Sequence, residues 1–197
     1  MRRRVRGAVL LVLGLVLTVT GTVSYARQEQ RERLAERDAS LLLQDMVLDM
    51  QQRHDEGVVV EAPKDQMPQV TVDGEALVGM LQIREKDILL PVLDQWDYEK
   101  LNIAPCRYSG TLEEDNLVLM GHNYEGHLGL IRQLEAGDLV EFIDVEGREH
   151  CFVVRETAVL QPTDVDIFIQ KGAALSVFTC TDGGERRFAI FCDWVEQ

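Results

Sequence analysis

An uncharged stretch of twenty residues near the N-terminus constrains the chain most strongly. Residues 7–26, GAVLLVLGLVLTVTGTVSYA, contain no charged side chain. A helix of this length is about 30 Å long, which matches the hydrocarbon core of a bilayer, and a helix satisfies its own backbone polar groups there. We therefore expect residues 7–26 to form a transmembrane anchor that follows a short cytoplasmic tail, residues 1–6.

Arginines flank this stretch unevenly. Four arginines lie within residues 2–6, whereas Arg27 alone follows the stretch. Positive charge on the N-terminal side favours a cytoplasmic N-terminus, so we expect a single-pass protein of the cell membrane with an extracellular remainder. A cleaved signal peptide is the alternative, because Ser24-Tyr25-Ala26 offers small residues at the right spacing. The apolar core of a signal peptide is usually shorter, roughly 7–15 residues, which favours the uncleaved anchor.

The remainder of the chain is acidic. The 197 residues have a formal net charge of −14, with 34 acidic and 20 basic side chains, and five of the basic ones lie within residues 1–27, which hold no acid. Proteins that bind nucleic acids coat phosphates with basic side chains. The charge therefore argues against a nucleic-acid partner.

Residues 28–56 are predicted to be helical. They contain no Gly or Pro, and Gly57 follows as a typical helix stop. One face at helical spacing is apolar and consists of Ala39, Leu42, Leu43, Met46 and Met50. We interpret residues 27–68 as a helical stalk that ends in a linker, residues 57–68.

Short apolar runs separated by turn signals occupy the remaining domain, residues 69–197. Turn signals such as Asp73-Gly74 and Glu146-Gly147 separate them. The predicted strands are residues 77–83, 88–92, 116–120, 139–145, 150–160, 174–179 and 188–194. At least seven short strands in one domain predict a mainly β fold, a barrel or a sandwich.

One of the four cysteines stands in a distinctive context. No two cysteines form a CxxC pair, so a structural zinc site is not expected. Cys180 ends a strand-like run and is followed by a Gly-Gly loop and by Arg186-Arg187, and a nearby cation favours a reactive thiolate. A lone cysteine of this kind is nevertheless more often structural. The others, Cys106, Cys151 and Cys192, are interpreted as small buried side chains or as halves of a disulfide.

A histidine occupies a similar position at the end of another predicted strand. His122 follows residues 116–121, and His127 lies five residues later, between Gly126 and Gly129. The two histidines are a conceivable metal pair, but no third ligand stands out. We expect neither a metal ion nor a cofactor.

These elements together resemble the sortase family, the membrane-anchored cysteine transpeptidases of mainly Gram-positive bacteria. Gly121-His122 matches the family's strand-end histidine, and LSVFTC, residues 175–180, matches its TLxTC motif, with Ser176 in place of the usual leucine. Arg187 matches its arginine, with Arg186 as the competing choice. The resemblance covers roughly residues 75–195 and implies a closed β-barrel of about seven to eight strands, of a class B-like or related minor subclass.

The resemblance also implies a function. The protein is expected to cleave a C-terminal sorting signal of surface proteins through a thioester on Cys180 and to transfer the product to an amine of the cell wall or of a pilin. His122 then acts as the general acid and base, and Arg187 binds the oxyanion. Thr179 either shapes the substrate groove or is a strand residue with a satisfied hydroxyl. The alternatives are a membrane-tethered thiol protease with water as acceptor and a non-enzymatic β-barrel adaptor.

Overall fold

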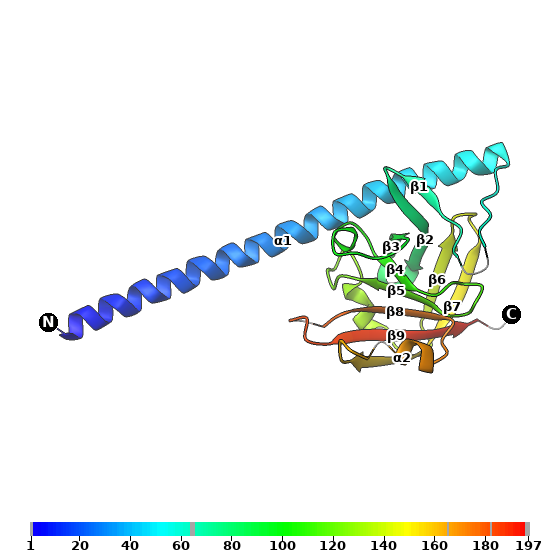
Figure 1. Ribbon diagram of the computed structural model, residues 1–197. Coiled ribbons are helices and arrows are strands. Elements are labelled where there is room, and N and C mark those ends of the chain that lie inside the picture. The colour runs from blue at the N-terminus through cyan, green and yellow to red at the C-terminus, as the bar shows by residue number, and fades with distance from the viewer. Residues whose placement is uncertain (1, 64–65, 165, 182, 196–197) are drawn as a thin grey trace. The chain divides into compact units, whose positions relative to one another are not determined.

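The computed structural model describes residues 2–63, 66–164, 166–181 and 183–195. A long helix, α1 (Arg2–Glu56), precedes the strands, and a short helix, α2 (Ile167–Gln170), lies before the last two of them in the chain (Figure 1). The strands in this part of the chain are β1 (Val70–Val72), β2 (Glu75–Ile83), β3 (Ile88–Leu93), β4 (Cys106–Ser109), β5 (Leu117–Gly121), β6 (Leu139–Asp144), β7 (Glu149–Leu160), β8 (Leu175–Cys180) and β9 (Arg187–Trp194). Short 3-10 helices are η1 (Arg84–Lys86), η2 (Lys100–Asn102) and η3 (Gly129–Gln133).

Residues 10–26 of α1 are uncharged, largely apolar and exposed. Within Leu10–Glu56 the helix holds an 18-residue window with a mean hydropathy of 1.6, none of which is buried. By length and composition it is therefore a candidate membrane anchor. Met1–Leu34 forms one compact unit of the chain, and Ala35–Gln197 forms a second unit that contains the rest of α1 and all the strands.

Eight strands close into a barrel, as predicted. Their order is β2-β3-β4-β5-β8-β9-β7-β6, and β6 pairs with β2 to complete the ring, while β1 extends β2 as a hairpin. The closure depends on a glycine, because a Cβ on Gly79 would collide with the main-chain oxygen of Ile143 and lie 2.5 Å from the ring of Phe142. A side chain at this position would separate β2 from β6.

The barrel interior forms the main core. The part of α1 that belongs to the second unit contributes Ala39, Leu42 and Met46 to this core, which is the face predicted from the sequence. Successive side chains of a strand point to opposite faces. On β8, Leu175 and Val177 belong to the barrel core, whereas Phe178 belongs to a second apolar cluster.

This second cluster covers one outer face of the barrel. It joins Phe178 of β8 to Phe168 of α2 and Phe191 of β9, and Figure 1 shows α2 beside β9. Cys180 is two residues after Phe178, so its side chain points to the same outer face. The predicted nucleophile therefore lies outside the barrel core, at the end of a strand that is otherwise buried on both faces.

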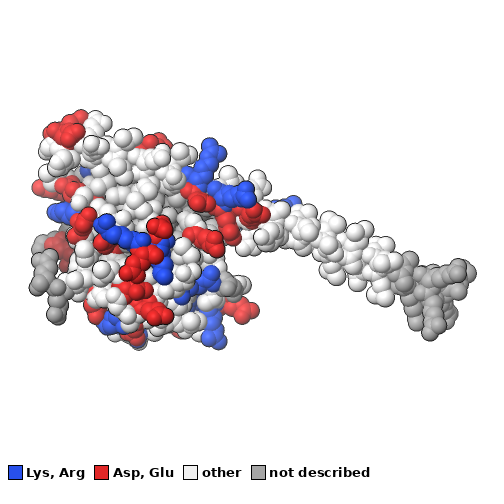
Figure 2. All heavy atoms as spheres, turned by 180° about the vertical axis from the view of Figure 1, so that it is seen from behind, with Lys and Arg blue, Asp and Glu red and all other residues white. Residues whose placement is uncertain are grey.

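The described surface mixes charges of both signs. Figure 2 shows acidic and basic side chains interspersed over one face of the strand-containing unit, and no continuous basic stripe crosses it.

Candidate active site

Three neighbouring strands bring the predicted site residues together. β8 pairs in parallel with β5, where Gly121 lies opposite Thr179, and it pairs antiparallel with β9, where Cys180 lies opposite Arg187. Directly opposite residues point to the same face of a sheet. His122 follows Gly121 as Cys180 follows Thr179, so the histidine and the cysteine leave adjacent strand ends at the same level.

All four predicted site residues line one pocket. Its volume is about 240 Å³, and His122, Cys180 and Arg187 contribute to its wall together with Thr179. The site residues are therefore assembled around a single concave surface on the outer face of the barrel. Arg186 is exposed and does not line this pocket, which favours Arg187 as the site arginine.

Aromatic rings also line this pocket, and the sequence did not single them out. Tyr108 stacks on Trp96 at 5.9 Å and meets the edge of Phe178 at 5.5 Å, measured between ring centroids. Phe168 stacks on Phe178 at 4.9 Å, and Tyr98 contacts Trp96 and also lines the pocket. Aromatic rings thus line the same pocket as the polar site residues.

The ring of His122 is half-buried and contacts other rings. Burial lowers the pKa of its imidazole below the usual 6.5, so the neutral form is favoured. The ring stacks on Tyr124 with 4.7 Å between centroids and an interplanar angle of 27°. Among the described residues, it makes no hydrogen bond to a carboxylate.

The loop that carries His122 is closed by its own backbone. The amide of Leu128 donates to the carbonyl of His122 at 3.1 Å, and the amide of Gly129 donates to the carbonyl of Tyr124 at 2.8 Å. A Cβ on Gly129 would lie 2.6 Å from the carbonyl oxygens of both Asn123 and Tyr124. Only glycine permits this tight loop, which holds the histidine at the end of β5.

His127 lies at the base of the same loop and not in the pocket. Its side chain is fully buried, and within the described ranges neither ring nitrogen has a hydrogen-bond partner of good geometry, although backbone groups of Ala35 and Ile103 lie nearby. Burial, together with the proximity of His122, lowers the pKa of His127 from 6.5 to about 4. The imidazole of His127 is therefore neutral at physiological pH.

The four cysteines are free thiols in different surroundings. Cys180 is half-buried in the pocket wall and Cys151 is exposed. Cys106 and Cys192 are buried, and this burial raises the pKa of each thiol to about 12. Of these thiols, Cys180 alone lines the pocket beside a histidine and an arginine.

The two remaining site residues are held by hydrogen bonds to the main chain. The guanidinium of Arg187 donates to the carbonyls of Gly184 and Arg186, each at 3.1 Å. The buried hydroxyl of Thr179 donates to the carbonyl of Gly121 at 2.9 Å and thereby ties β8 to β5 next to the histidine. The hydroxyl is satisfied, and a role of Thr179 in substrate binding stays a prediction.

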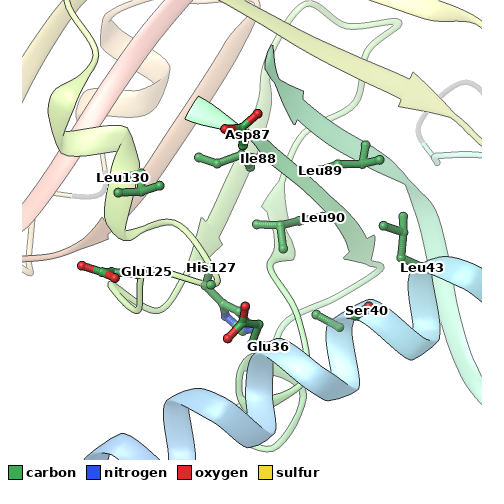
Figure 3. Close-up of a pocket in the computed structure, with 12 residues that line it drawn as sticks. Glu36, Ser40, Leu43, Asp87, Ile88, Leu89, Leu90, Glu125, His127 and Leu130 are labelled. Carbon is green, nitrogen blue, oxygen red and sulfur yellow. The ribbon is translucent and has the colours of Figure 1, made fainter. Parts of the chain in front are cut away.

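A larger pocket, of about 350 Å³, lies elsewhere in the second unit (Figure 3). It is formed by α1, β3 and the loop before η3, and none of the four predicted site residues lines it. Carboxylates of Glu36, Asp87 and Glu125 contribute to its wall. Within the part of the chain that the structure describes, no group of three or more potential ligands is arranged to hold a metal ion.

Comparison with solved structures shows a shared fold. A sortase D5 transpeptidase from Clostridium perfringens is 12% identical with a TM-score of 0.57, over 83% of this chain and 99% of that one. Sortase A from Corynebacterium diphtheriae is 14% identical with a TM-score of 0.56, over 90% and 96%. Sortase C from C. perfringens, solved with a C-terminal cell wall sorting motif, is 14% identical with a TM-score of 0.54, over 90% and 100%. At these identities the likeness concerns the fold, and the predicted class B-like subclass stays a prediction.

The sequence itself adds the family assignment. No curated protein matches the chain. The model of the sortase domain, however, matches residues 81–195, which is more than half of the chain and includes every predicted site residue. Members of this family are cysteine transpeptidases, and the barrel found here is the one that they share. The chain therefore belongs to the sortase family.

Proposed function

We propose that the protein is a membrane-anchored sortase that cleaves a C-terminal sorting signal of surface proteins and transfers the acyl fragment to an amine. One observation carries the proposal: Cys180, His122 and Arg187 line one pocket at the ends of three adjacent strands. A thiol, an imidazole and a guanidinium in one pocket supply a nucleophile, a proton carrier and an anion-stabilising donor.

The reaction begins with attack of the Cys180 sulfur on a peptide carbonyl carbon. The thiol proton passes to the neutral imidazole of His122 as the carbon–sulfur bond forms, and the guanidinium of Arg187 donates hydrogen bonds to the resulting oxyanion. The imidazolium then gives its proton to the departing amine as the peptide bond breaks. The product of this half-reaction is a thioester on Cys180 and a neutral imidazole.

The second half-reaction returns the enzyme to its starting state. An incoming amine attacks the thioester carbon and loses a proton to His122. The carbon–sulfur bond breaks, the new amide is released, and the proton returns to the sulfur. Lowering of the pKa of His122 by burial suits both steps, because the neutral imidazole must accept a proton each time.

The shape of the pocket supports a peptide as the substrate. Rings of Trp96, Tyr108 and Phe178 line the pocket together with Cys180 and offer an apolar surface to side chains next to the scissile bond. A sortase C of C. perfringens was solved with a sorting motif, and we infer that a sorting motif is the ligand here as well. The acceptor is an amine of the cell wall or of a pilin.

The apolar part of α1 supports a location at the membrane. Its length and hydropathy suit a single span, and the arginines at residues 2–6 favour a cytoplasmic N-terminus. A domain tethered in this orientation meets surface proteins as they emerge from the membrane. The catalytic unit is then extracellular.

The proposal is tested with the full chain in detergent or nanodiscs and a library of peptides that carry C-terminal sorting motifs. Wild-type protein is expected to gain the mass of an acyl fragment on Cys180 and to form an amide when an amine is added. Cys180→Ala is expected to do neither, whereas Cys151→Ala, which removes an exposed thiol outside the pocket, retains both. Acylation of Cys180→Ala, or an unchanged wild-type mass with every peptide, contradicts the proposal.

Adding the amine separates transfer from hydrolysis. Release of the fragment as a free acid at the same rate with and without amine identifies a thiol protease. If alkylation of Cys180 leaves binding of the sorting peptide unchanged and no acylation is seen in the untreated protein, the protein is a binding module instead.

A further inference from the structure

The histidine of the site has no orienting carboxylate within the described residues, and it has a ring stacked on it instead. General acid–base catalysis requires that the imidazole point at the reacting atoms, and a hydrogen bond from a third group often fixes it. Here the ring of Tyr124 covers one face of His122, with 4.7 Å between centroids and 27° between planes. This contact restricts the rotation of the imidazole.

Tyr124 is itself held in place by the backbone and by the buried ring of His127 in the same loop. Its carbonyl accepts hydrogen bonds from the amides of His127 and Gly129, and its ring lies 5.8 Å from the buried ring of His127. The base of the loop is packed against α1, where Gly126 leaves no room for a Cβ beside Glu36, and Figure 3 shows His127 next to Glu36. The buried residues at the base of the loop thus support the stacked ring of Tyr124, while His122 lines the pocket.

We propose that Tyr124 is a positioning residue, which fixes the imidazole of His122 by stacking on its face. The proposal rests on the proposed function of Cys180 and His122 and adds the group that orients the histidine. An aromatic face also attracts a cation, so Tyr124 stabilises the imidazolium that forms when His122 takes the thiol proton. Burial of His122 has the opposite effect, because it disfavours the charged ring.

Other titratable and charged groups line the pocket with His122 or lie near its ring. They are Cys180 of β8, Arg187 of β9, Asp164 of the loop after β7, Tyr98 and Tyr108 from the β3–β4 region, and His127 of the same loop. Substitution of Tyr124 leaves all of these groups in the protein. A change in the titration of His122 in such a variant therefore reports the loss of the stacked ring.

The test compares Tyr124→Phe, which keeps the ring, with Tyr124→Leu, which removes it, in the full chain. The pKa of His122 is followed by NMR of histidine-labelled protein, and kcat and KM are measured with a sorting peptide and an amine. We expect Tyr124→Leu to lower the pKa of His122 by roughly one unit and kcat about tenfold, with little change in KM. Tyr124→Phe is expected to retain both values.

Controls separate this role from general destabilisation. Glu125→Gln changes the next residue of the loop, which is exposed and outside the pocket, and is expected to match wild type. Thermal unfolding verifies that each variant is folded. An unchanged pKa of His122 in Tyr124→Leu, or equal losses in the Phe and Leu variants, overturns the proposal, because the ring is then not the active part.

The NMR titration does not depend on catalysis. If wild-type protein forms no thioester but the pKa of His122 falls in Tyr124→Leu alone, the proposed function fails while the stacking contact is verified. If thioester forms normally and the titration is insensitive to the ring, the positioning role fails while the proposed function stands.

Discussion

Cys180 and Arg187 are register partners across β8 and β9, and both line the pocket that also contains His122. The strand pairing fixes their side chains on one face of the sheet, so their proximity does not depend on a flexible loop. The Arg187 guanidinium is bound to two main-chain carbonyls of the β8–β9 connection, Gly184 and Arg186, and this holds it at the rim of the pocket.

This pairing predicts unequal effects at two adjacent arginines. Arg187→Ala is expected to lower kcat for peptide cleavage about 10²- to 10³-fold, because a donor to the oxyanion is lost. Arg187→Lys restores the charge but not the planar fork, so it recovers only part of the rate. Arg186→Ala, which removes an exposed side chain outside the pocket, should stay close to wild type. Steady-state kinetics check all three variants. A larger loss of kcat in Arg186→Ala than in Arg187→Ala would show that Arg186 is the oxyanion donor and would contradict this prediction.

The surroundings of the four thiols predict their order of alkylation. Cys106 and Cys192 are buried and their pKa values are raised to about 12, so almost no thiolate forms at pH 8. We expect iodoacetamide to label Cys151 and Cys180 in the folded protein and all four cysteines after denaturation. Peptide mapping by mass spectrometry identifies the sites. A bound sorting peptide should protect Cys180 and leave Cys151 reactive, and labelling of Cys106 in folded protein would contradict the structure.

Burial of His127 predicts a pH dependence of stability. Its pKa is about 4 in the folded protein and 6.5 in the unfolded chain, so the unfolded chain binds more protons between these values. With respect to this group, the free energy of unfolding should therefore be at its maximum above pH 6.5. It should fall by about 3 kcal/mol as the pH drops towards 4. Denaturation curves from pH 4 to 7.5 measure this change.

The matched variants for this experiment are His127→Phe and His54→Gln. The phenylalanine cannot be protonated, so most of the loss between pH 6.5 and 4 should disappear. His54 is exposed at the end of α1, and its replacement should leave the curve unchanged. An identical pH dependence in wild type and His127→Phe would assign the loss to other groups.

The hydrogen bond of the Thr179 hydroxyl predicts a loss of stability when the hydroxyl is removed. Thr179→Val keeps the shape of the side chain but removes the hydrogen bond to Gly121, and it is expected to lower the free energy of unfolding by about 1–2 kcal/mol. Thr179→Ser retains the donor and should retain the bond. Chemical denaturation together with KM measurements checks this. A raised KM with unchanged stability in Thr179→Val would instead support contact with the substrate.

Much of the barrel could be predicted because its longer strands carry a clear pattern. Seven predicted runs correspond to β2, β3, β5, β6, β7, β8 and β9, each within about two residues at its ends. β1 and β4 were missed because they are only three and four residues long, and the polar side chains of Arg107 and Ser109 interrupt the apolar pattern of β4. Such short strands form because longer neighbours offer them hydrogen-bond partners.

The site could be predicted only in part, for a related reason. Cys180, His122 and Arg187 stand out because each lies where an apolar run begins or ends next to a loop. Trp96 and Tyr108 lie in a segment without clear periodicity, so their place in the pocket wall depends on the tertiary fold. Spacing also gave no indication that His127 is fully buried, since a loop between two glycines is usually exposed.

The order of the strands has a consequence for biosynthesis. β9 pairs with β8 on one side and with β7 on the other, although it lies later in the chain than both. Until β9 has been inserted, the sulfur of Cys180 has no guanidinium opposite it, and β8 has an open edge. A nascent polypeptide that has not yet delivered Arg187 is therefore expected to lack the proposed oxyanion donor, so that the pocket is completed together with the barrel.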